Sequence, residues 1–156
     1  MSQVRTYKVK SPLAKQLDEP GGRTVGDATR LATHELEAHR EAVMTTITAT
    51  LDELDALASA AEDGTGPRVY RLASAIIDLG GFFDTGPLHE AAYSLCDVAD
   101  HMNGTETWRW PPVTVHLQAM RLILAGGCRS GRTSDTLLAG LRSVSDRVLP
   151  ARDPKG

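Results

Sequence analysis

The longest stretch of the chain without a strong helix breaker, Thr24 to Asp63, constrains the fold most. It has no proline, and its only glycine, Gly26, stands close to its start, while alanine, leucine and glutamate are frequent. Because proline and glycine are the residues that helices tolerate least, the stretch predicts one long helix despite its threonines. Its second half carries one apolar helical face, made of Val43, Ile47, Leu51, Leu54 and Leu57.

The first half of this long helix is more polar. Leu31 and Leu36 are its only large apolar residues between Val25 and Val43. A long helix without a strong apolar stripe in its first half is typical of one that projects from a bundle or pairs with another chain. We therefore expect a homodimer formed through the first helix.

Four shorter helices follow, each bounded by proline, glycine or a capping residue. They are predicted over 67–79, over 87–102, from Pro111-Pro112 through the segment "VTVHLQAMRLILAGG", and after a cap at Thr133 or Ser134. Short connections place successive helices antiparallel. The sequence predicts an all-α antiparallel helical bundle over 25–149, with an extended arm over 1–24 and a tail over 150–156.

Composition excludes several classes of protein. The chain has 156 residues, enough for one domain, with 41% hydrophobic and only 4% aromatic residues, and a net charge of −3. It has no basic domain for nucleic acid and no apolar run of membrane-spanning length. No secretory signal is apparent, so we expect a cytoplasmic protein whose two cysteines, Cys96 and Cys128, are reduced core thiols.

No pattern in the sequence predicts catalysis or a metal. The segment "HELEAH" has one residue too many for the HExxH zinc motif, so His34 and His39 lie about 140° apart on a helix and face different directions. The cysteines have no CxxC spacing, and there is no GxSxG motif. We expect no enzyme activity, no metal and no cofactor.

The segment "RVYRLASAIIDLGG" (68–81) has the pattern of small and apolar residues found in one particular helix of histidine-phosphotransfer domains. That family's motif has the form H-x-L-K-G-A-A-x-x-L-G, and Leu72, Ala75, Leu79 and Gly80 match it. The following helix continues the likeness. The chain thus resembles a histidine-phosphotransfer domain, which implies a four-helix core, here with a long first helix and an extra C-terminal helix. The residues of the following helix that match are Leu88, Ala91, Ala92 and Leu95.

At the two positions that carry this family's reaction, the chain has other residues than the motif. Tyr70 stands where the phosphorylated histidine would be, and Ala73 where the lysine would be. The resemblance then implies a pseudo-site that keeps a docking surface for a receiver domain or a histidine kinase. An alternative is that the small residues of this helix only pack against a neighbouring helix. The candidate partner-binding residues are Tyr70, Arg71, Ala73, Ser74 and Asp78.

His116 offers a second hypothesis, an active phosphotransfer protein with a non-standard histidine. It stands ten residues before Gly126, which is the spacing of the motif, but the residues between do not fit the motif. On its helix it falls at the margin of the apolar stripe, a position typical of a half-buried imidazole that hydrogen-bonds a neighbour.

The order of features along the chain also resembles small helical proteins encoded in alphaproteobacterial chemotaxis gene clusters. These features are "LAKQL" and "PGG" in the arm, the long first helix, the hairpin described above and the helix "VHLQAMRLIL". The resemblance implies a signalling adaptor that works near a histidine kinase or its receivers.

Overall fold

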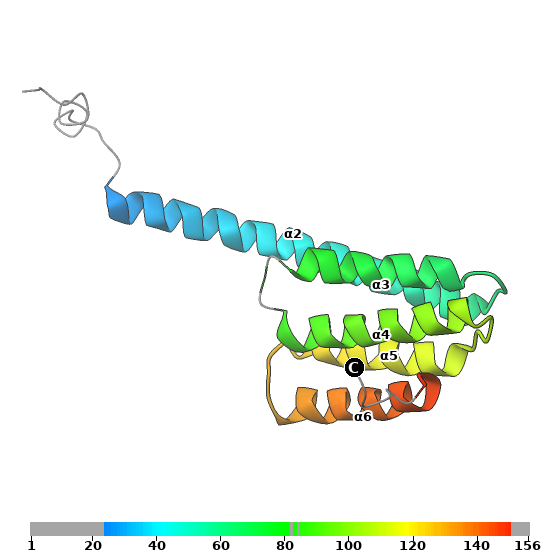
Figure 1. The fold of residues 1–156 in the computed structure, drawn as a ribbon. Helices are drawn as coiled ribbons and strands as arrows, with labels where there is room; N and C mark the ends of the chain where they lie inside the picture. Colours follow the sequence, from blue (N-terminus) through cyan, green and yellow to red (C-terminus); the bar gives the residue numbers. More distant parts are fainter. Residues whose placement is uncertain (1–23, 82, 84, 151–156) are drawn as a thin grey trace, which may run out of the picture. The chain divides into compact units, whose positions relative to one another are not determined.

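The computed structural model describes residues 24–81, 83 and 85–150, and these residues form five α-helices and no strand (Figure 1). The predicted all-α fold with a long first helix is confirmed. The predicted arm lies outside the described residues except for Thr24, and the predicted tail lies outside them except for Pro150.

Helix α2 runs from Val25 to Ala60 and crosses the boundary between two compact units, residues 1–39 and 40–156. In the first unit Thr24 caps the helix, because its hydroxyl accepts the N–H of Asp27 at 3.2 Å and donates to the carboxylate of Asp27 at 2.6 Å. The hydrogen bonds from Thr24 and Arg30 lower the pKa of the Asp27 carboxyl. The described residues of this unit include no buried side chain.

In the second unit, the rest of α2 presents the predicted apolar stripe to the core. Its buried residues are Val43, Ile47, Leu51 and Leu54, and Leu57 is half-buried beside them. Two arginines tie this part of α2 to other helices. Arg68 pairs with Glu53, and Arg121 donates to Asp55 at 2.9 Å from Nε.

Helices α3 (Gly66–Gly80) and α4 (Gly86–Gly104) form an antiparallel hairpin. Each begins with a glycine-proline pair, and proline fits the first turn because its missing N–H has no helical partner there. The start of α3 lies directly on the end of α4. A Cβ at Gly66 would stand 2.1 Å from Oδ1 of Asn103, so this close approach requires glycine.

Helices α5 (Trp110–Ala125) and α6 (Arg132–Val148) complete the unit. The turn between them uses left-handed backbone at Gly127 (φ 71°) and Cys128 (φ 56°). The predicted cap at Thr133 or Ser134 was misplaced, because the cap residue is Gly131. The Ser134 hydroxyl acts from inside the first turn, accepting the N–H of Gly131 at 2.9 Å and donating to its carbonyl at 2.8 Å.

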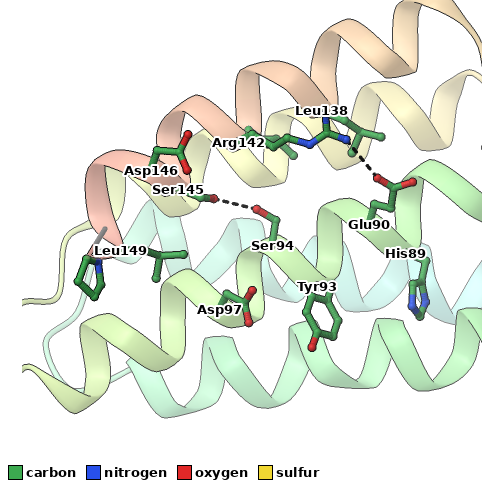
Figure 2. A pocket seen from close by; sticks show the side chains of 12 residues that line it. His89, Glu90, Tyr93, Ser94, Asp97, Leu138, Arg142, Ser145, Asp146 and Leu149 are labelled. Atoms are coloured by element: carbon green, nitrogen blue, oxygen red, sulfur yellow. Dashed lines mark hydrogen bonds and ion pairs between the residues drawn. The ribbon is translucent and has the colours of Figure 1, made fainter. Parts of the chain in front are cut away.

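Helix α4 is central, because it packs against α3, α5 and α6, and α5 also packs against α6. Short loops make α5 antiparallel to both α4 and α6, so α4 and α6 run parallel. Two contacts between α4 and α6 agree with this parallel direction, because the residue numbers rise together in both helices. Glu90 pairs with Arg142, and Ser94 pairs with Ser145 (Figure 2). The core that these helices enclose is aliphatic, and the two cysteines are buried in it as free thiols.

Candidate functional site

A groove of about 860 Å³ lies between the parallel helices α4 and α6. Helix α4 provides one wall and α6 with the two residues after it provides the other (Figure 2). Its volume lies in the range of binding sites for small molecules. The lining residues are His89, Glu90, Tyr93, Ser94, Asp97, Leu138, Leu141, Arg142, Ser145, Asp146, Leu149 and Pro150.

A chain of hydrogen bonds below the groove joins three helices. Nδ1 of His116 in α5 lies 2.7 Å from the Pro112 carbonyl, which can only accept, so Nδ1 carries the proton. Nε2 then accepts from the Ser94 hydroxyl at 3.0 Å. Ser94 Oγ in turn accepts from the Ser145 hydroxyl at 2.9 Å. A single neutral tautomer of His116 thus satisfies both imidazole nitrogens and allows the hydrogen bonds of Ser94 and Ser145.

The Ser94–His116 hydrogen bond resembles the pairing of a serine nucleophile with its base, but the surroundings do not favour that chemistry. Ser94 lies in the middle of α4, where backbone N–H groups bond within the helix and none is left to hold an oxyanion. His116 is fully buried, and this burial lowers its pKa, opposed by the hydrogen bond to Pro112. A protonated imidazole is therefore disfavoured here. The chain of hydrogen bonds is a structural link between α4, α5 and α6.

His116, the alternative phosphoacceptor, is thus placed in the core. It is 0% exposed, whereas a half-buried side chain was predicted, and both of its nitrogens are hydrogen-bonded. A phosphoryl donor has no access to either nitrogen in this structure. The reason for the deeper burial is that α5 packs against both α4 and α6, so its buried arc is wider than the apolar stripe alone.

The groove's rim carries most of its charge. Glu90 and Arg142 pair across it at 3.7 Å between Oε2 and a guanidinium nitrogen. Asp97 and Asp146 also line it, and within 24–81, 83 and 85–150 neither carboxylate forms an ion pair. Tyr93, 57% exposed, stands on the α4 side. The groove therefore combines an apolar base with an acidic edge.

The predicted docking residues of α3 lie on two sides of the helix. Tyr70, Arg71 and Asp78 are exposed, and Ser74 is half-buried. Ala73 is fully buried in the core, so it is not part of the exposed face. Ala73 packs in the core, as the alternative interpretation of this helix predicted.

Cys96 lies behind the exposed face of α3, with its Sγ 4.0 Å from the carbonyl oxygen of Tyr70. Burial, and then the negative charges of Asp97, Asp78 and Asp100, raise the pKa of this thiol to about 11. Burial also raises the pKa of Cys128. Both thiols are protonated at neutral pH, and a thiol rather than a thiolate is a poor nucleophile.

Ser94 and Ser145 were not identified as functional residues from the sequence, although the position of Ser145 indicates that its side chain is buried. Ser145 follows Leu141 by four residues and Leu138 by seven, so it continues the apolar stripe of α6 with a polar side chain. Ser145 is 8% exposed, whereas the neighbouring Val144 is half-buried. A serine on a buried stripe indicates a hydrogen-bond partner on a neighbouring helix.

Within the described part of the chain, no three histidine, cysteine or carboxylate side chains gather as they would around a metal ion. None of the described helices is long and apolar enough to span a membrane. Comparisons with protein-family models, with curated proteins and with solved structures give no match to this chain.

Proposed function

We propose that this protein is a non-catalytic adaptor that binds a receiver domain or a histidine kinase of a two-component signalling system. The observation that carries the proposal is the exposed face of α3, which we define as Tyr70, Arg71, Ser74 and Asp78. At 100° per residue these four side chains lie within about 100° of the helix circumference. The resemblance of α3 and α4 to the phosphotransfer hairpin supplies the class of partner.

The chemistry of this face suits protein binding. Tyrosine and arginine are enriched where interfaces gain most of their affinity, since each offers large contact area together with hydrogen bonds. Tyr70 is 39% exposed, and Arg71 and Asp78 add charges of both signs. The small side chain of Ser74 between them lets a partner approach the helix closely.

The alternative, an active phosphotransfer protein that uses His116, has less support. Phosphotransfer between proteins needs an imidazole nitrogen that the donor can reach. His116 is fully buried, and its two nitrogens are taken by Ser94 and Pro112. Tyr70, at the position of the family's histidine, would form a phosphate ester that is too stable to recharge an aspartate readily.

Binding can be tested by titration calorimetry with the receiver domains and histidine kinases of the source organism. We expect one of them to bind, and Arg71→Glu to weaken that complex at least about tenfold. Arg132→Glu is the matched control, because it makes the same charge change at an exposed position of α6. Equal loss in both variants, or no binding by any receiver or kinase, would contradict the proposal.

We also propose self-association through the first unit's part of α2. Its described residues, 24–39, expose Leu31 and Leu36, which are 40% and 59% accessible. Light scattering should give a mass above the 16.8 kDa of one chain, and Leu36→Glu should lower it. Leu122→Glu is the matched control, since Leu122 is also 59% exposed but lies in α5. A mass near 16.8 kDa at high concentration would exclude the dimer.

A further inference from the structure

The groove between α4 and α6 has the dimensions of a short helix. Along α4 it extends from His89 to Asp97, and along α6 from Leu138 to Leu149. At 1.5 Å per residue, these stretches are about 12 Å and 17 Å long, which equals two to three turns of an α-helix. The two walls are parallel helices, so the groove runs along their common direction.

The base of the groove offers apolar contact. Leu138 and Leu141 are 7% and 2% exposed, and Leu149 is half-buried at the end of α6. The exposed ring of Tyr93 adds an aromatic side chain on the α4 side. An amphipathic helix laid into such a groove buries its apolar side chains at a spacing of three and four residues.

The charges around the groove indicate the polar face of the occupant. Three carboxylates line it, those of Glu90, Asp97 and Asp146. Arg142 is already engaged by Glu90, and no described cation pairs with the other two carboxylates. His89 is the remaining basic group. Lysine or arginine side chains along the edges of an incoming helix would therefore meet complementary charge.

We propose that this groove binds a basic amphipathic helix of two to three turns from a partner protein. The site lies on α4 and α6, apart from the α3 face that carries the proposed adaptor function. Its partner is recognised by apolar side chains at helical spacing on one face and by lysine or arginine on the other.

The probe is a synthetic peptide of about twelve residues, with leucine at spacings of three and four and lysine elsewhere. A second peptide has glutamate in place of lysine. Fluorescence anisotropy with the full chain should show binding of the lysine peptide only. The double variant Asp97→Lys/Asp146→Lys should weaken it at least about tenfold and favour the glutamate peptide.

The matched control is Asp63→Lys/Glu106→Lys, which changes the net charge equally at exposed positions that do not line the groove. It should keep the preference for the lysine peptide. The proposal is wrong if the lysine peptide fails to bind, if both peptides bind alike, or if the two double variants behave alike. A dimer that only Asp97→Lys/Asp146→Lys dissociates would assign the groove to a second copy and also overturn it. None of these results depends on Arg71, so failure here is distinguishable from failure of the adaptor proposal.

Discussion

Ser94 of α4 and His116 of α5 are joined by a hydrogen bond of 3.0 Å between Oγ and Nε2, in a core that is otherwise almost wholly apolar. A buried imidazole nitrogen without a partner costs free energy, so this bond fixes how α4 and α5 pack. Ser145 extends the link to α6. The three residues stabilise the junction of these helices below the groove.

Removing the hydroxyl of Ser94 should lower the free energy of unfolding more than removing that of Ser145. Ser94→Ala leaves Nε2 of His116 buried and unpaired, so we expect the free energy of unfolding to fall by about 1–3 kcal/mol. Ser145→Ala should cost about 1 kcal/mol, because Ser94 keeps its bond to His116. Ser143→Ala, at an exposed position of α6, should change the free energy of unfolding by less than about 0.5 kcal/mol. Urea unfolding measures all three, and equal losses for Ser94→Ala and Ser143→Ala would contradict the assigned network.

Stability should fall in mild acid because of His116. Burial lowers its pKa below 6.5 in the folded protein, so below that pH the unfolded chain binds a proton that the folded chain does not. The contribution of the neutral, buried imidazole to the free energy of unfolding is therefore complete above pH 6.5 and is lost as the pH falls below it. Urea unfolding as a function of pH should show a shallower acid loss in His116→Gln than in the natural chain. The same acid loss in His116→Gln and in the natural chain would contradict this account of the buried imidazole.

Two glycines should respond to alanine in opposite directions. Gly66→Ala places a methyl group against Asn103 and Trp108, so we expect destabilisation of about 1–3 kcal/mol. Gly140, in the interior of α6, has nothing within 4 Å of a Cβ, and Gly140→Ala should stabilise by about 0.5–1 kcal/mol. Thermal unfolding distinguishes them. A melting temperature that rises in both variants would contradict the close contact between α3 and the end of α4.

The helices were predictable from the sequence because their ends are marked locally. The helix predicted over 67–79 is α3, Gly66–Gly80, and the one predicted over 87–102 is α4, Gly86–Gly104. Proline in the first turn and glycine at the end act through the backbone of a few residues. A cap in a glycine-rich loop is less well marked, which is why the start of α6 was misplaced at Thr133 or Ser134.

The site was not predictable in the same way, since it depends on which helices are neighbours. Ser94 and Ser145 are 51 residues apart, and nothing local indicates that they meet. His116 was placed at the margin of one apolar stripe, but a helix that packs against two others is buried over a wider arc. Ala73 was assigned to a docking face from its position in the family's motif, and the motif does not show which side of the helix packs into the core.

One measurement tests the central claim, that this protein acts by docking and not by phosphotransfer. The protein is incubated with a phosphorylated receiver that it binds, carrying a radioactive phosphoryl group, and the complex is separated on a sizing column. We expect the protein to elute with the receiver while its own chain carries no acid-labile label, because His116 is buried behind Ser94. Acid-labile label on this chain that His116→Gln removes would contradict the account.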